Sequence, residues 1–352
     1  MVLERLDVPI VLAPMAGGPS TPALAAAVAG AGGLGFLASG YLSAARTREQ
    51  LAEARRLTSG PVGVNVFVPG DAAPERESLE RYLERLRAWA GGVGAELGEP
   101  VRDDDDWGAK VDLLAREAVP VVSFTFGCPP PDVIERLQGA GSEVWVTVTA
   151  VDEASEAAGA GADALVVQGA EAGGHRGSFA DRPDLPVDGL LPLLQTIAAK
   201  VPMPLVAAGG IATGPAVAAV LCAGAAAAQL GTAFMLCPEA GTSPAHREAL
   251  RSPRSTALTR AFTGRLARGI RNDFMDRHSE GAPIAYPEVH HVTAPLRRAA
   301  REAGDADRIN LWAGEAHELA EPLPAAEVVA RLARGARDAS ARVARRLAAS
   351  SR

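Results

Sequence analysis

Lysine is almost absent from this chain of 352 residues, which contains only Lys110 and Lys200. Enzymes that use pyridoxal phosphate attach the cofactor to a lysine as a Schiff base, so this class of enzyme is disfavoured. Cysteine is also rare. Its three copies, Cys128, Cys222 and Cys237, show no metal-ligand spacing and are odd in number. This pattern predicts a reducing, cytoplasmic compartment.

The sequence also lacks any concentration of positive charge. The net charge is −7 and residues of both signs are interspersed, so we expect no nucleic-acid partner. The run of four aspartates at 103–106 raises the question of a metal site. Consecutive carboxylates do not easily converge on one ion, so we interpret this run as a solvated loop and expect no metal.

Long uninterrupted apolar segments are missing as well. Residues 201–238 carry no charge and are numerous enough to cross a bilayer. Glycine and proline nevertheless break this segment into pieces of strand and helix length. The N-terminus carries Glu4 and Asp7 and lacks the layout of a signal peptide. We therefore expect a soluble globular protein without a membrane partner.

What the chain does contain is an alternation of short apolar runs with Ala-, Leu- and Arg-rich segments of helical periodicity. Buried apolar strands that alternate with helices are typical of a parallel sheet covered by helices. Eight such units predict an α/β fold, a closed (β/α)8 TIM barrel. The predicted strands are 10–15, 34–39, 62–68, 121–126, 144–149, 164–168, 205–208 and 227–234.

An insertion after the third strand and a change of pattern after Phe234 predict a smaller, mainly helical lid that binds the substrate. We assign residues 71–105 and 237–310 to the lid, with helical pieces near 78–90, 244–251 and 255–262. The barrel then comprises residues 1–70, 106–236 and 311–352, closed by an amphipathic helix over 325–346. The oligomeric state stays open, with a homodimer among the options.

Candidate site residues follow from the rule that such barrels bind ligands at the carboxyl ends of their strands. Gly-rich turns and uncharged amides converge there, together with one histidine, His175. The candidates are Ala13, Pro14, Met15, Asn65, Gln168, Gly173, Gly174, His175, Gly209, Gly210, Gln229, Leu230, Gly231 and Thr232.

The last two strand ends are the usual phosphate site of this architecture. Gly209-Gly210 precedes a helix, and Gly231-Thr232 offers backbone N–H groups and a hydroxyl. Such donors bind a dianion without lysine or arginine. Close packing of strand against helix would also select glycine, so the turn alone is weak support.

The amides and the histidine suit a flat, polar ligand. Asn65 and Gln168 donate and accept hydrogen bonds, as the edge of a flavin ring requires; alternatively, they satisfy buried backbone groups. His175 serves as a base when neutral or stabilises an anion when protonated; the alternative is a packed core histidine. We interpret Glu171 as a residue that holds the histidine loop by accepting backbone N–H bonds.

Taken together and in order, five motifs resemble the nitronate monooxygenase family. They are Pro14-Met15, the Gly-Val-Asn-Val-Phe strand at 63–67, Gln-Gly-x-Glu-Ala-Gly-Gly-His at 168–175, Gly-Gly-Ile at 209–211 and Gln-Leu-Gly-Thr at 229–232. The segment 309–314 is similar to that family too. The histidine segment is the most specific of these elements.

The resemblance implies bound FMN, with its phosphate on Gly209-Gly210 and the 229–232 loop. It places Gln168, Gly173 and Asn65 near the ring and His175 beside the substrate. The implied reaction oxidises an alkyl nitronate, and optionally a nitroalkane, with O2 to a carbonyl compound and nitrite. Substrate identity depends on the lid, which lacks lysine entirely.

Three other functions compete with this interpretation, and the missing cysteine disfavours the second of them. The first is an FMN-dependent NAD(P)H:quinone or enoyl reductase on the same scaffold. The second, a nucleotide dehydrogenase, needs a cysteine in the loop after the sixth strand, and residues 169–187 contain none. The third is a flavin-binding protein without catalysis. Cys128, at the end of the fourth strand, and the pair His290-His291, in the lid, are further candidates for the site; the alternatives are an inert buried thiol and a surface turn. His246 has no neighbours that suggest a function.

Overall fold

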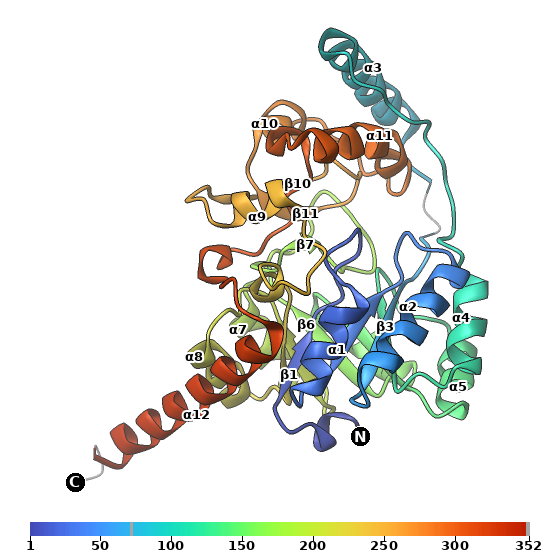
Figure 1. Cartoon of the computed structure of the whole chain (residues 1–352). Coiled ribbons are helices and arrows are strands. Elements are labelled where there is room, and N and C mark those ends of the chain that lie inside the picture. Colours follow the sequence, from blue (N-terminus) through green and yellow to red (C-terminus); the bar gives the residue numbers. More distant parts are fainter. Residues whose placement is uncertain (71–72, 350–352) are drawn as a thin grey trace.

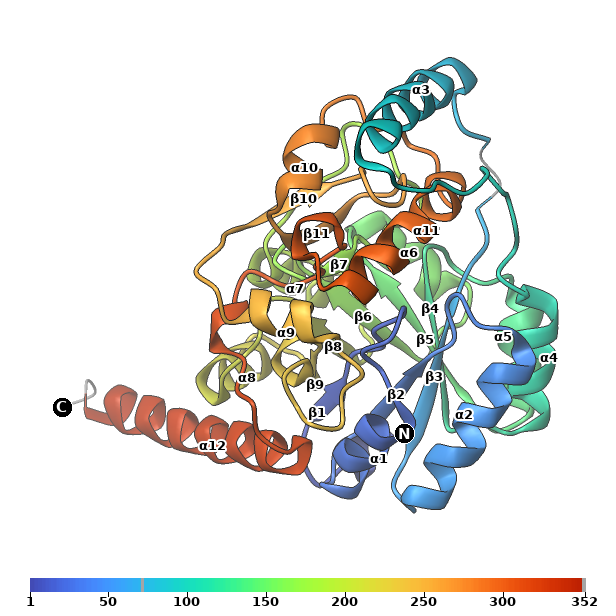
Figure 2. The ribbon, with the colours of Figure 1, turned by 45° about the horizontal axis from the view of Figure 1, so that its top comes forward.

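The computed structural model describes residues 1–70 and 73–349 and shows eight parallel strands that close into a barrel (Figures 1 and 2). Their order is β1-β9-β8-β6-β5-β4-β3-β2, and a parallel bridge from Val11 to Leu34 closes the ring. The predicted (β/α)8 barrel is confirmed. The strands are β1 (Ile10–Leu12), β2 (Gly35–Ala38), β3 (Val62–Phe67), β4 (Val121–Thr125), β5 (Glu143–Val148), β6 (Ala164–Gln168), β8 (Leu205–Ala208) and β9 (Ala227–Leu230).

The barrel strands are almost entirely buried because both of their faces are covered. One face of each strand packs on the surrounding helices, and the other fills the barrel interior. Trp145 and Phe36 occupy the interior with ring centroids 5.9 Å apart. Continuous apolar runs rather than alternating patterns are the expected result.

The helices of the barrel follow their strands in sequence. Several begin at a side-chain cap or a proline, as at Thr21, whose side chain accepts a hydrogen bond from the N–H of Leu24 at 3.0 Å. The helices are α1 (Pro22–Gly30), α2 (Ala44–Leu57), α4 (Trp107–Arg116), α5 (Pro131–Gly139), α6 (Val151–Gly159), α7 (Leu190–Ala198), α8 (Gly214–Cys222) and α12 (Ala325–Ala349). Of the helices described, none is long and apolar enough to cross a membrane.

The segments that we assigned to a lid form a second layer above the barrel (Figure 1). They contain α3 (Arg76–Val93), α9 (Pro244–Leu250), α10 (Asp273–His278) and α11 (Glu288–Ala303). Tyr82 and Leu86 of α3 pack with Phe262, Phe274 and other side chains into an apolar cluster separate from the barrel core. The boundary residues 71–72 and 350–352 of our assignment lie outside the described residues.

One element of the lid was predicted wrongly. Residues 255–262 were expected to be helical, but the structure has strand β10 (Thr256–Thr259) there. This strand pairs antiparallel with β11 (Ala267–Ile270), which pairs in turn with β7 (Gly174–His175). Pairing with a distant strand overrides the local helical pattern, and it also joins the histidine loop of the barrel to the lid.

The aspartate run at 103–106 is largely exposed, as expected, but it is more than a solvated loop. Asp105 forms a 2.7 Å ion pair with the fully buried Lys110 and accepts a 2.8 Å hydrogen bond from the N–H of Tyr41. Asp103 contacts the Nε2 atom of His291 at 2.8 Å. The run therefore ties the lid insertion to the barrel and to α11. In the described part of the chain, no three His, Cys, Asp or Glu side chains gather as a metal site would require.

Helix α12 packs across α8 through two glycines. A Cβ atom added at Gly214 would lie 2.5 Å from the Cα atom of Gly335, too close to be accommodated without displacing a helix. Beyond this crossing, the end of α12 projects away from the body of the molecule (Figures 1 and 2). The crossing fixes the start of α8, which borders the candidate site.

We predict that Gly214→Ala lowers the free energy of unfolding by about 1–3 kcal/mol, the usual cost of inserting a methyl group into tight packing. Gly108→Ala in α4 is the matched control, because no atom lies within 4 Å of its added Cβ. This control is expected to be neutral or stabilising by up to roughly 1 kcal/mol. Chemical denaturation of both variants measures the difference, and equal effects would contradict the tight crossing.

Candidate active site

A cavity of about 420 Å³ opens at the carboxyl end of the barrel, between the strand ends and the lid. The alternation of side chains along each strand explains much of its lining. In β3, β6 and β9, the residues on the outer face pack on helices. Asn65, Gln168 and Gln229 lie on the inner face, toward the carboxyl end of each strand. Strand register places Gln168 beside Ala208 and Ala208 beside Gln229.

All fourteen residues that the sequence nominated line this one cavity. They are Ala13, Pro14, Met15, Asn65, Gln168, Gly173, Gly174, His175, Gly209, Gly210, Gln229, Leu230, Gly231 and Thr232. Lining a cavity does not test what each residue binds, so their roles stay predictions.

The loop after β8 has the backbone of an anion-binding turn. Gly209 and Gly210 have φ values of 119° and 66°, in the left-handed region that favours glycine. The loop leads to α8, whose N-terminus is capped by the side chain of Thr213. Next to it, the Thr232 hydroxyl accepts a 3.0 Å hydrogen bond from the N–H of Gly314. Main-chain donors and a helix N-terminus therefore meet at one end of the cavity, an arrangement that suits a phosphate.

The amide of Gln168 holds the histidine loop. Its Nε2 atom donates to the carbonyl of His175 at 3.1 Å, and its Oε1 atom accepts from the N–H of Gly177 at 2.8 Å. A glutamine amide has two donor hydrogens and an acceptor oxygen with two lone pairs, so half of this capacity is left for a ligand. Thus Gln168 has a structural use that the sequence did not separate from ligand binding.

Asn65 is 2% exposed and uses its Nδ2 atom on the neighbouring strand. This atom donates to the hydroxyls of Ser123 at 2.9 Å and Thr125 at 3.0 Å. Within the described residues, its Oδ1 atom has no hydrogen-bond donor. The orientation of the amide is therefore fixed, and its carbonyl oxygen is the group that it can offer to a ligand.

His175 lies among aromatic rings at the junction of barrel and lid. The rings of Phe126, Tyr286 and Trp312 have centroids 5.5–5.7 Å from the imidazole, and its Nε2 atom lies 2.9 Å from the hydroxyl of Thr263. Burial, reinforced by the positive charges of Arg265 and Arg297, lowers the pKa of His175 from 6.5 to about 3. The imidazole is therefore neutral at physiological pH.

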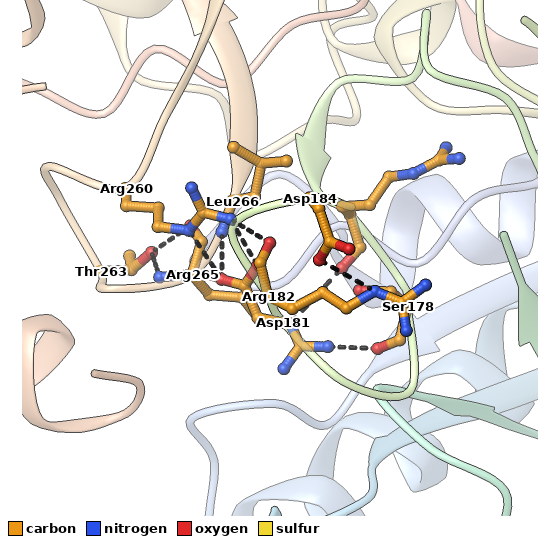
Figure 3. Close-up of polar contacts among 9 residues, drawn as sticks. Ser178, Asp181, Arg182, Asp184, Arg260, Thr263, Arg265 and Leu266 are labelled. Carbon is orange, nitrogen blue, oxygen red and sulfur yellow. Dashed lines mark hydrogen bonds and ion pairs between the residues drawn. The ribbon is translucent and has the colours of Figure 1, made fainter. Parts of the chain in front are cut away.

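The loop that carries His175 is clamped to the segment between β10 and β11 (Figure 3). Asp181 accepts hydrogen bonds from the guanidinium of Arg260 at 2.7 and 3.0 Å and from the N–H of Leu266 at 3.1 Å. Arg265 donates to the carbonyl of Ser178. At the other end, Glu171 accepts from the N–H of Leu190 at 3.0 and 3.1 Å, the loop-holding role that we expected.

Sequence reasoning missed two arginines of the cavity. Arg297 and Arg301, both on α11, line its wall, and none of the lining residues is Asp or Glu. Arg297 donates to the hydroxyl of Thr293 at 3.0 Å and to the carbonyl of His290 at 2.8 Å. No carboxylate in the described ranges lies within 4.0 Å of either arginine. Burial lowers the pKa of Arg297 to about 10, so it remains charged at neutral pH.

Two further histidines line the cavity, whereas Cys128 does not. His290 lines the cavity and stacks on Tyr41 with ring centroids 4.1 Å apart. His246 also lines it, although the sequence gave no hint of this, and its Nε2 atom lies 3.0 Å from the carbonyl oxygen of Trp312. Cys128 lies outside the cavity lining, and burial raises its pKa to about 11, as befits an unreactive thiol.

Comparisons with known proteins agree with this architecture. The family model described as nitronate monooxygenase matches residues 3–335. A nitronate monooxygenase from Pseudomonas aeruginosa is 44% identical over 94% of this chain and 96% of its own length. The crystal structure of nitroalkane oxidase from Streptomyces ansochromogenes is 48% identical, with a TM-score of 0.94 over 97% of this chain and 99% of that one.

FabK from Thermotoga maritima is more distant, at 28% identity and a TM-score of 0.76 over 97% of this chain and 96% of that one. The match of the family model extends over the barrel and the lid segments alike. The chain therefore belongs to the nitronate monooxygenase family, whose members are flavin-dependent oxidoreductases.

Proposed function

We propose that this protein uses FMN to oxidise alkyl nitronates, and nitroalkanes, with O2 to a carbonyl compound and nitrite. The observation that supports this most directly is the character of the cavity wall. It contains two arginines and a neutral histidine but no carboxylate. Such a wall attracts an anion and repels no negative charge that develops during its oxidation.

The residues fit FMN at two points, its phosphate and its ring. The phosphate would lie on Gly209-Gly210 and on the loop 229–232, where main-chain donors and the start of α8 meet. Asn65, Gln168 and Gly173 would adjoin the ring. Gly173 has no space for a side chain, because an added Cβ atom would lie 2.4 Å from the carbonyl carbon of Ala313. When bound, FMN would accept electrons from the substrate and pass them to O2.

The chain itself supplies charge, proton transfer and exclusion of water. Arg297 and Arg301 draw the anionic substrate into the cavity, and the rings around His175 keep the reacting carbon dry. A nitronate needs no base, because its α-carbon has already lost the proton. A neutral nitroalkane does need one, and the unprotonated imidazole of His175 is the group placed to accept that proton.

The proposal is tested by anaerobic mixing of the purified protein. We expect a yellow preparation whose flavin absorbance is bleached by ethyl nitronate and only slowly by NADH. In air, O2 uptake should match the nitrite and aldehyde formed. Rapid bleaching by NADH and none by the nitronate would identify a reductase instead, and failure to take up FMN at high concentration would refute the proposal altogether.

For His175→Ala, we expect FMN to stay bound and the turnover of neutral nitroethane to fall by ~10²–10⁴-fold, the usual contribution of a positioned base. Oxidation of preformed ethyl nitronate should change far less. His291→Ala is the matched control, since His291 lies outside the cavity lining and contacts Asp103. Oxygen-uptake rates with both substrates give the result, and equal losses on both would argue against a base.

For Arg297→Met, we expect the KM for ethyl nitronate to rise roughly tenfold, or about 1.4 kcal/mol, the scale of one screened charge–charge contact. The kcat should stay within a few-fold, and Arg297→Lys should recover part of the loss. Arg298→Met is the control, because Arg298 is exposed on the same helix. An unchanged KM in the Met variant would show that Arg297 does not attract the substrate.

A further inference from the structure

Among the residues that the structure describes, the imidazole of His175 has one polar side-chain partner, the hydroxyl of Thr263. Thr263 is 1% exposed, and its Oγ1 atom lies 2.9 Å from the Nε2 atom of the imidazole. The same oxygen lies 3.3 Å from the carbonyl oxygen of Arg265 and 3.4 Å from the nitrogen of Arg265. One hydroxyl thus faces three polar atoms, and its single hydrogen can go to only one of them.

The three contacts can be satisfied together in one way only. A hydroxyl offers one hydrogen and two lone pairs. The Arg265 carbonyl can only accept, so it takes the hydroxyl hydrogen, and the Arg265 N–H can only donate, so it takes one lone pair. The remaining lone pair accepts from His175, which requires a hydrogen on Nε2. If the hydroxyl donated its hydrogen to Nε2 instead, the Thr263 oxygen and the Arg265 carbonyl oxygen would face each other with no hydrogen between them, and that hydrogen bond would be lost.

The opposite nitrogen of the ring is the one left to react. A neutral imidazole that carries its hydrogen on Nε2 has a free lone pair on Nδ1. Within the described residues no atom hydrogen-bonds to Nδ1, and this nitrogen is not among the enclosed unpartnered atoms. Since His175 lines the cavity, its Nδ1 lone pair is accessible to a bound molecule.

Thr263 itself is held in place by the clamp between loop and lid (Figure 3). Asp181 binds Arg260 and Leu266 on either side of Thr263, and the N–H of Arg176 donates to the carbonyl of Leu266 at 2.8 Å. The pairing of His175 with Ala267 fixes the other side of the contact. The two backbone segments that carry the hydroxyl and the imidazole are thus held together by strand pairing and by an ion pair.

We propose that Thr263 is a positioning residue that fixes the tautomer of His175, so that Nδ1 is the atom that removes the α-proton of a neutral nitroalkane. The inference rests on the proposed function and names the atoms within it. The C–H bond at the α-carbon breaks, its proton moves to Nδ1, and its electron pair moves onto the nitro group to give the nitronate. The imidazolium keeps its Nε2 hydrogen on the Thr263 oxygen and later releases the new proton to water.

The groups that face His175 do not compete for this role. Tyr286 and Phe126 present rings, and Arg265 and Arg297 are cations. His290, which also lines the cavity, accepts from Arg297 at 3.3 Å through its Nδ1 atom, and burial lowers its pKa to about 2. Burial and the charges around the ring therefore keep the imidazole of His175 neutral at rest.

Thr263→Val tests the inference, because valine keeps the shape and removes the hydroxyl. We expect the kcat for nitroethane to fall roughly 10- to 100-fold, the scale of a misplaced reacting group. Its KM and the kcat for ethyl nitronate should stay within about threefold, and Thr263→Ser should restore most of the loss. Equal losses on both substrates, or no recovery in the serine variant, would overturn the positioning role.

Nitrogen NMR of the wild-type holoenzyme, labelled with ¹⁵N-histidine and assigned with His175→Ala, reads the tautomer directly. We expect a hydrogen on Nε2 and none on Nδ1 of His175 at neutral pH. A hydrogen on Nδ1 would overturn the inference even if every variant were poorly folded. Because this readout needs no turnover, it separates failure of the tautomer assignment from failure of the proposed activity.

Discussion

The antiparallel pairing of Gly174 and His175 with β11 is the constraint on which the site depends. Through this short contact, a loop of the barrel becomes part of the lid. Gly173 allows the loop to approach the backbone of Ala313 closely, and the side-chain amide of Gln168 hydrogen-bonds to the loop at His175 and Gly177. This junction holds the loop of the imidazole against the lid, and residues of the lid cover the strand ends to form the cavity.

Charge is distributed around this junction in an unusual way. Two arginines of α11 line the cavity, and nearby arginines bond to carbonyl oxygens and aromatic faces as well as to carboxylates. Arg265 stacks over Phe126 at 4.1 Å, and Arg297 donates to a carbonyl of its own helix. Burial, reinforced by these positive charges, lowers the pKa of His175 and keeps it unprotonated, and the positive charges also favour an anion. The same cations that favour an anionic ligand thus also keep the imidazole neutral before a substrate binds.

The sequence predicted the barrel well because its signals are local. Eight apolar runs between helical segments define the repeat, and the rule that ligands bind at strand ends selects Asn65, Gln168 and Gly209 without knowledge of the lid. The lid was less predictable. Residues 255–262 have a helical pattern but form a strand, since their partner, β11, becomes available only through the tertiary fold. Arg297 and Arg301 look like surface residues of an amphipathic helix, and only the packing of α11 over the barrel shows that they face inward.

The order in which the chain closes on itself has a consequence for biosynthesis. Strand β1 pairs with β9, more than two hundred residues later, and α12 packs on both α8 and α1. Such distant pairings fold slowly and late. A nascent polypeptide that has emerged only as far as the histidine loop has neither the second glycine-rich turn nor the overlying arginine helix. The cavity therefore cannot assemble until nearly the whole chain has left the ribosome.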